Sequence, residues 1–320
     1  MLKKIALIGG GNIGGVLAQE IFQRKLAATV ALVDVKGPDV AKGKCLDIAE
    51  AAPIVKSDVK FQAGKEYDVL TDADLVINTA GVPRTVRPDG TFPSREELLA
   101  VNLQITDKVA AAIMQFCPNA IVISIANPLD AIVFRLFQKM NPPKHKLMGM
   151  AGALDSARYR YFVAGAAGVS VDNVEAMVLG GHGDDMVPIR SHTTVLGIPV
   201  AKLIPAERLD AIEKRVRNAG AEVVNLLKTG SAYYSPASSA LQMAEAYLHD
   251  RKMVLPAAAY LEGEYGLSGL YVGVPVQIGA GGVEKVFEIA LTAEEKEALA
   301  VSASHVRELV EATGRVLAQG

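Results

Sequence analysis

The first half of the chain alternates short apolar runs with segments of helical spacing. The apolar runs cover residues 5–8, 30–33, 75–77 and 121–125. Runs of this length without alternation are typical of parallel strands that are buried on both faces of a sheet. Between the first two runs, apolar residues recur every three or four positions, as they do in an amphipathic helix. Strands separated by helices predict a parallel sheet.

Each apolar run ends in small or polar residues. The first run leads into Gly9, the second into Asp34, the third into Asn78 and the fourth into Asn127. In an open α/β sheet, ligands bind at the carboxyl ends of the strands. The pattern therefore places the predicted ligand site at this edge.

The pattern changes near residue 148, where the following extended segments are interrupted by glycine and proline. These are signals of hairpins rather than of helical crossovers. Long helical stretches follow at about 205–228 and 236–248, and a last helix begins at a capping box formed by Thr292 and Glu295. We therefore predict an α/β fold, with a doubly wound parallel sheet in residues 1–145 and an α+β domain in residues 146–320.

Charge and hydropathy exclude several classes of partner. The chain has 320 residues, and 33 Lys+Arg against 35 Asp+Glu give a net charge of −2. This balance does not provide the basic surface that binds nucleic acid or an acidic membrane. No apolar stretch reaches the ~20 residues of a membrane span, and none has the pattern of a signal peptide. We expect no nucleic-acid or membrane partner and a cytoplasmic location.

Cysteine and histidine spacing gives no metal signature. Cys45 and Cys117 form no CxxC pair, and the five histidines form no HExxH motif. We therefore expect no metal and two free thiols.

A glycine-rich turn lies between the first predicted strand and helix. Gly9, Gly11 and Gly14 follow the spacing GxGxxG, and the loop is completed by Gly10, Asn12 and Ile13. In this pattern the glycines allow a tight turn, close approach of a pyrophosphate and close packing of the helix, whose N-terminus attracts phosphate.

Asp34 follows 20 residues after Gly14 (34 − 14 = 20), at the end of the second strand. A carboxylate there binds both ribose hydroxyls of an adenosine and repels a 2′-phosphate. The alternative is a solvated aspartate at a strand end. The spacing predicts a site for NAD rather than NADP.

Three arginines, Arg84, Arg87 and Arg95, follow the third strand in a segment rich in proline and glycine. Guanidinium groups bind carboxylates bidentately, although a solvated basic loop is the alternative. Ser94 and Glu97 form a capping box, so Arg95 is expected in the first turn of a helix.

Further candidates lie outside this loop. Asp155 and Arg158 are three positions apart and so share a helix face, as a surface ion pair would also do. Glycines on both sides of His182 leave its imidazole accessible for acid/base chemistry, and His192 is the competing histidine. The amide of Asn127 is able to bond a cofactor and a substrate hydroxyl, or it simply forms an Asn-Pro turn.

Five motifs in this order resemble the lactate/malate dehydrogenase family, and within it the lactate-dehydrogenase-like bacterial malate dehydrogenases. The resemblance extends over essentially the whole chain. The motifs are Gly9 to Gly14, Thr79 to Arg84, Ala126 to Asp130, Leu154 to Arg158, and Gly181 to Gly183. The resemblance implies a Rossmann NAD-binding domain and a catalytic domain. It also implies hydride transfer between (S)-malate and oxaloacetate in the tricarboxylic acid cycle, by a homodimer or homotetramer.

The resemblance also implies catalytic and substrate-binding roles. His182 is the acid/base, and Asp155 orients it and raises its pKa. Arg158 holds the C1 carboxylate, Arg95 polarises the carbonyl, and Arg84 binds the second carboxylate, which favours malate over lactate. Cofactor contacts are implied for Asn102, Ile125 and Asn127, of which Asn127 also contacts the substrate.

The loop departs from the family pattern. Arg84 and Arg95 are 11 positions apart (95 − 84 = 11), where the family usually has six, so five residues are inserted. Arg87 or Phe92 of this insertion is therefore an alternative to Arg84 at the distal carboxylate. We expect residues 82–96 to form a lid. Two other functions stay open, which are a dehydrogenase of lactate or another 2-hydroxy acid and a non-catalytic NAD sensor.

Overall fold

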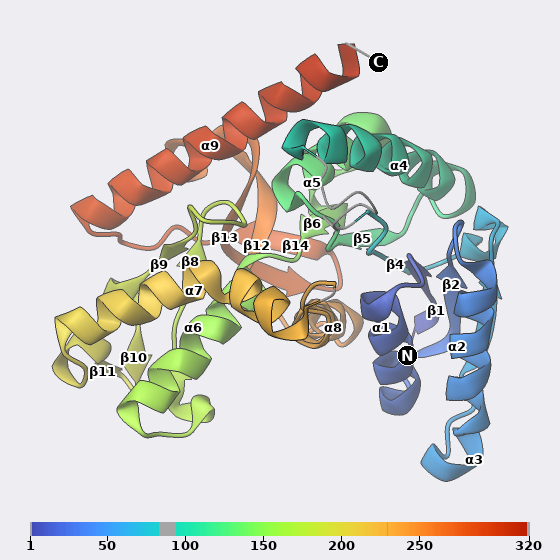
Figure 1. The fold of residues 1–320 in the computed structure, drawn as a ribbon, viewed down its shortest axis with the longest axis horizontal. Coiled ribbons are helices and arrows are strands. Elements are labelled where there is room, and N and C mark those ends of the chain that lie inside the picture. Colours follow the sequence, from blue (N-terminus) through green and yellow to red (C-terminus); the bar gives the residue numbers. More distant parts are fainter. Residues whose placement is uncertain (1, 83–93, 229, 319–320) are drawn as a thin grey trace.

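A nine-stranded sheet runs through the computed structural model, which describes residues 2–82, 94–228 and 230–318 (Figure 1). Six of its strands are parallel, in the spatial order β3-β2-β1-β4-β5-β6. This is the doubly wound order, and it confirms the predicted parallel sheet. The six strands are β1 (Leu2–Ile8), β2 (Ala27–Val33), β3 (Lys60–Gly64), β4 (Leu75–Asn78), β5 (Ile121–Ser124) and β6 (Leu147–Gly149).

The other three strands of this sheet form the predicted hairpins of the second half. They are β12 (Met253–Glu262), β13 (Ser268–Gly279) and β14 (Gly282–Val286). β12 pairs antiparallel with β6 where Ala258 lies opposite Gly149, so one sheet continues from the first half of the chain into the second. Two small antiparallel sheets lie outside it, and their strands are β7 (Val174–Glu175), β10 (Thr194–Val195) and β11 (Ile198–Pro199), and β8 (Val178–Leu179) and β9 (Val187–Pro188).

Helices cover both faces of the sheet (Figure 1). On one face, α1 contacts α8, and on the other α4, α5 and α9 contact one another. The helices are α1 (Asn12–Arg24), α2 (Pro38–Glu50), α3 (Ala52–Val55), α4 (Arg95–Phe116), α5 (Leu129–Met140), α6 (Gly152–Ala167), α7 (Ala206–Leu227), α8 (Tyr234–Leu248) and α9 (Ala293–Ala318). Among the described residues, no helix is both long enough and apolar enough to cross a membrane.

The apolar core has a layer on each face, and β1 shows why its sequence is continuously apolar. Ile5 and Leu7 belong to one buried cluster together with Leu17 of α1. Ala6 and Ile8, which alternate with them, belong to a second cluster on the side of α4 and α5. Because successive side chains of a strand point to opposite faces, every position of a strand covered on both faces must be apolar.

Two helices that matter for the site begin at the predicted capping boxes. Ser94 Oγ accepts the Glu97 N–H at 3.0 Å, and the Ser94 N–H donates to Glu97 Oε2 at 2.8 Å. At α9, Thr292 and Glu295 exchange the same two bonds, at 3.2 and 3.0 Å. Each box satisfies backbone donors that have no partner within the helix. Local sequence therefore decides where both helices begin.

Candidate active site

The glycine-rich loop is a tight turn between β1 and α1. Gly9 has a φ of +107°, a conformation that a residue with a Cβ atom rarely adopts. A Cβ on Gly14 would stand 2.0 Å from the carbonyl oxygen of Gly9, whereas a Cβ on Gly11 would have no atom within 4 Å. No side-chain hydrogen bond caps α1 at Gly11. Open space at an uncapped helix N-terminus fits a phosphate group.

Asp34 lies beside this loop, immediately after β2. Its Oδ2 accepts the Gly10 N–H at 2.8 Å, and its Oδ1 accepts the N–H groups of Lys36 at 3.0 Å and Gly37 at 2.8 Å. Backbone amides therefore fix the orientation of the carboxylate. The loop residues Asn12, which is exposed, and Ile13, which packs against the core, begin α1.

Sequence reasoning missed Lys44 of α2. Its Nζ donates to the carbonyl oxygens of Gly10 at 2.8 Å and Gly11 at 2.7 Å. Burial lowers the pKa of Lys44, and the charge of Asp34 acts in the opposite direction. No local signal distinguishes this lysine from its neighbours on α2, because its partners lie more than 30 positions away. The Lys44 ammonium group therefore stabilises the turn through these two hydrogen bonds.

Two predicted catalytic residues and one predicted substrate-binding residue meet in one cluster. His182 Nδ1 lies 2.8 Å from Asp155 Oδ2, and Arg158 Nη1 donates to Asp155 Oδ1 at 3.2 Å. The Asp155 side chain is 2% exposed, whereas that of His182 is 17% exposed and that of Arg158 is 14% exposed. One buried carboxylate thus orients both an imidazole and a guanidinium that reach the surface. This is the arrangement that an acid/base and a carboxylate-binding group require.

The charges around His182 favour its protonated form. Burial lowers the pKa of His182, but the charge and hydrogen bond of Asp155 and the charge of Asp130 raise it, and Arg158 lowers it. The net direction is upward. The protonated imidazole that these charges favour is able to donate a proton to a substrate oxygen.

Asn102 joins two strand ends at the same edge of the sheet. Its side chain is buried, and its amide accepts the Val82 N–H at 2.7 Å and donates to the carbonyl oxygens of Val82 at 3.2 Å and Asn127 at 3.0 Å. Asn127 itself is exposed and precedes a cis peptide bond to Pro128. The Ile125 side chain is buried in the core, so its backbone is the part left for a ligand.

The predicted loop arginines fall where the structure gives no description of their side chains. Arg84 and Arg87 lie outside the described residues, and so does Phe92. The backbone of Arg95 begins α4, as predicted, but its side chain is also outside them. The roles of these residues and the lid of residues 82–96 therefore stay predictions.

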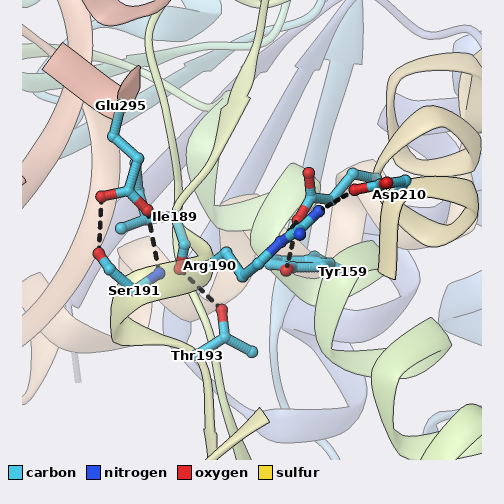
Figure 2. A network of polar contacts seen from close by, with 8 residues as sticks. Tyr159, Ile189, Arg190, Ser191, Thr193, Asp210 and Glu295 are labelled. Atoms are coloured by element: carbon cyan, nitrogen blue, oxygen red, sulfur yellow. Dashed lines mark hydrogen bonds and ion pairs between the residues drawn. The ribbon is translucent and has the colours of Figure 1, made fainter. Parts of the chain in front are cut away.

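The competing histidine, His192, belongs to a different polar network. Its Nδ1 lies 3.0 Å from Ser191 Oγ, and Ser191 bonds Glu295 of α9 through both its N–H and its hydroxyl, at 2.9 and 2.6 Å. Figure 2 shows Ser191 facing Glu295, with Arg190 directed the other way, toward Asp210 and Tyr159. The network ties the segment after the histidine loop to α9 on one side and to α6 and α7 on the other.

The buried part of this network includes Tyr159, the residue after Arg158 on α6. Arg190 Nε donates to Glu213 Oε1 at 2.7 Å, and the hydroxyl of Tyr159 donates to the same oxygen at 3.3 Å. Thr193 Oγ1 donates to the Ile189 carbonyl oxygen at 2.8 Å, as Figure 2 also shows. Because Tyr159 directly follows Arg158 on α6, its bond to Glu213 connects the helix of the candidate site to α7.

A cavity of about 590 Å³ lies between α6 and α7. Phe162 and Arg215 line it, but no histidine or carboxylate does. The Arg215 guanidinium stacks 4.2 Å from the Phe162 ring centroid and bonds Glu222 at 2.7 Å, so its charge already has a partner. This cavity is therefore not the candidate active site.

Comparisons with known proteins match both halves of the chain to one family. Residues 3–149 match the model of the lactate/malate dehydrogenase NAD binding domain, and residues 152–315 match that of the lactate/malate dehydrogenase alpha/beta C-terminal domain. The chain is 52% identical to malate dehydrogenase 1 of Anaeromyxobacter dehalogenans over 313 residues. The aligned part covers 97% of this chain and 98% of that protein.

Solved structures with both activities are similar in fold. The Cryptosporidium parvum malate dehydrogenase has a TM-score of 0.92 and 41% identity, over 98% of this chain and 100% of that one. The lactate dehydrogenase of the same organism, complexed with lactic acid and β-nicotinamide adenine dinucleotide, has a TM-score of 0.92 and 40% identity, over 98% of each chain.

Proposed function

The chain belongs to the lactate/malate dehydrogenase family, and we propose that it is an NAD-dependent malate dehydrogenase, which interconverts (S)-malate and oxaloacetate. The observation that carries the proposal is the cluster in which Asp155 orients both His182 and Arg158. A non-catalytic NAD sensor has no need for a buried carboxylate that aligns an acid/base with a substrate-binding cation. The 52% identity to a malate dehydrogenase supports the choice of substrate.

The NAD site fits the residues at the carboxyl end of the parallel strands. We assign cofactor binding to residues 1–145 and substrate chemistry to residues 146–320. The open space at Gly11 and the uncapped start of α1 suit the pyrophosphate, and Asp34 suits the adenosine ribose. When bound, NAD supplies the hydride acceptor, and NADH the donor.

His182 moves the proton of the reaction. In reduction, the protonated imidazole donates from Nε2 to the keto oxygen of oxaloacetate, and in oxidation the neutral ring takes the proton from the malate hydroxyl. Asp155 stabilises the imidazolium at Nδ1 and keeps the ring in place. Arg158 binds the C1 carboxylate bidentately. Asn127 contacts substrate and cofactor, and Asn102 holds its carbonyl group.

The lengthened loop supplies the remaining cations. Arg95, at the first turn of α4, polarises the substrate carbonyl, and Arg84 pairs with the distal carboxylate. From the sequence we expect residues 82–96, most of which lie outside the described residues, to close over the substrate. Exclusion of water would strengthen both interactions, because charges act more strongly where the dielectric constant is low. Arg87, which lies within the insertion, is the alternative partner of the distal carboxylate.

A lactate dehydrogenase is the second candidate, because the five extra loop residues lie where the substrate is selected and a lactate dehydrogenase shares the fold at 40% identity. Steady-state kinetics that follow NADH absorbance, with oxaloacetate and with pyruvate, separate the two. We expect kcat/KM for oxaloacetate to exceed that for pyruvate at least ~10²-fold, the scale of one lost buried charge pair. Higher efficiency with pyruvate would overturn the malate assignment.

The assembly is a homo-oligomer, a dimer or a tetramer, and it is cytoplasmic. Exposed apolar side chains favour self-association, because an interface would remove them from water. Val40 (59%), Leu46 (62%) and Ile54 (81%) are exposed on α2 and α3, and Tyr234 (67%) on α8. Light scattering coupled to size-exclusion chromatography measures the mass, and a monomer would contradict this assignment.

A further inference from the structure

Two consecutive amides of the histidine loop are held by side chains from two different helices. The Gly181 N–H donates to Ser302 Oγ of α9 at 2.9 Å, and the His182 N–H donates to Asp130 Oδ2 of α5 at 2.9 Å. Ser302 is 1% exposed and Asp130 is 4% exposed. The backbone at the catalytic histidine is therefore placed by buried side chains that lie 121 and 52 positions away in the chain.

The loop backbone lies in close contact with these helices, and a side chain at either glycine before His182 would collide with them. A Cβ on Gly180 would stand 2.5 Å from Ser302 Oγ, and a Cβ on Gly181 would stand 2.7 Å from Val306 Cγ2 and 3.3 Å from Asp130 Oδ2. The two glycines thus allow α5 and α9 to reach the loop backbone. These contacts restrict the backbone at His182 more than a solvent-exposed loop would.

A carboxylate is not needed merely to accept a hydrogen bond from a backbone amide. Ser302 shows that a hydroxyl performs this task one residue earlier. In contrast, Asp130 Oδ1 is buried and has no hydrogen-bond partner among the described residues. A buried polar atom without a partner costs about 1–3 kcal/mol of stability, and more if charged. The charge of Asp130 therefore requires a reason beyond the hydrogen bond.

The charge is available at neutral pH. Burial raises the pKa of Asp130 to about 6, against the lowering effects of the His182 amide and the His182 charge, so the group is ionised above this pH. The charged groups with the largest effects on the His182 pKa are Asp155 and Arg158 of α6 and Asp130 of α5. Asp130 adds to the effect of Asp155 and opposes that of Arg158.

We infer that Asp130 is a positioning residue for the catalytic histidine, which holds the His182 backbone amide and, through its negative charge, favours the protonated imidazole that donates to the substrate oxygen. This role rests on the proposed function, because it acts only through His182. It differs from the role of Asp155, which touches the ring itself. Asp130 thus combines two tasks in one side chain: it places the loop, and its charge favours the protonated imidazole.

The test compares Asp130→Asn with Ser302→Ala. Asp130→Asn keeps the shape and an amide acceptor but removes the charge, so His182 should lose its proton at lower pH. The alkaline limb of kcat/KM for oxaloacetate should move down by at least ~0.5 pH unit, a conservative value for a nearby charge. Ser302→Ala removes the neighbouring amide anchor without a change of charge, so it should lower kcat and leave the limb in place.

An NMR titration of histidine-labelled protein measures the same shift in His182 protonation without turnover. The His182 signal is assigned with the His182→Gln variant. If Asp130→Asn does not fold, Asp130→Ser carries the same comparison, because it offers the acceptor that Ser302 offers. An unmoved limb and an unmoved His182 titration, or equal shifts in both variants, would overturn the inference. If the wild type reduces pyruvate rather than oxaloacetate, the proposed substrate fails, and the pH comparison with pyruvate still tests Asp130.

Discussion

Gly14 in the first turn of α1 stands directly against the backbone of Gly9 at the end of β1, with 2.0 Å between a Cβ built on Gly14 and the Gly9 carbonyl oxygen. Gly11 lies between them and has nothing within 4 Å of the same constructed atom. Two glycines of one motif thus serve different needs. Gly14 allows the helix to pack on the strand, and Gly11 leaves space for a ligand.

This difference predicts opposite effects of two alanine substitutions. Gly14→Ala forces the backbone apart and should lower the free energy of unfolding by about 1–3 kcal/mol, the usual cost of overpacking. Gly11→Ala should change it by less than ~0.5 kcal/mol, as surface substitutions do, but weaken NADH binding at least ~10-fold. Denaturant unfolding and fluorescence titration with NADH measure the two effects. Unchanged NADH affinity in Gly11→Ala would place the pyrophosphate elsewhere.

Asp34→Ser should change the choice of cofactor. The carboxylate accepts three backbone N–H groups and offers a negative charge that repels a 2′-phosphate. Serine removes this charge, so kcat/KM with NADH should fall and the gap to NADPH should narrow by at least ~10-fold, about 1.4 kcal/mol. Kinetics with both cofactors measure it, and unfolding curves control for the lost loop contacts. A wild type that uses NADPH as well as NADH would refute the role of Asp34.

His182 and His192 form a matched pair for the acid/base assignment. His182→Ala should cut kcat by at least ~10²-fold, the scale of a positioned acid/base, while NADH binding persists. His192 contacts Ser191 in a separate network, so His192→Ala should leave kcat within a few-fold of the wild type. Measurements of kcat and titrations with NADH on both variants test which histidine is the acid/base. The reverse outcome would move the active site to the other network.

The loop arginines provide a test of substrate recognition. Arg84→Gln should lower kcat/KM for oxaloacetate at least ~10²-fold, about 2.8 kcal/mol, because it leaves a carboxylate without its cation, and it should spare pyruvate. Arg87→Gln is the matched control three positions away. We favour Arg84, because it keeps the family spacing from the end of β4. A large loss only in Arg87→Gln would transfer the role to the insertion.

Much of the fold follows from local sequence. The continuous apolar runs correctly predicted β1, β2, β4 and β5, because a strand covered on both faces requires apolar residues at every position. The capping boxes correctly predicted the starts of α4 and α9. The short strands were harder to predict from the sequence. β3 is only partly buried and β6 has three residues, so neither leaves a clear pattern.

The sequence by itself determined the residue types of the site, because the glycine spacing and the three-residue step from Asp155 to Arg158 act within one or two turns of chain. Only the tertiary structure decided what surrounds them. The pairing of β12 with β6, the bond of Lys44 to the glycine loop, and the seating of the His182 loop on Asp130 and Ser302 all join segments far apart in the chain. Such contacts depend on how whole layers pack. The sequence next to each residue therefore does not show which distant residue it will contact.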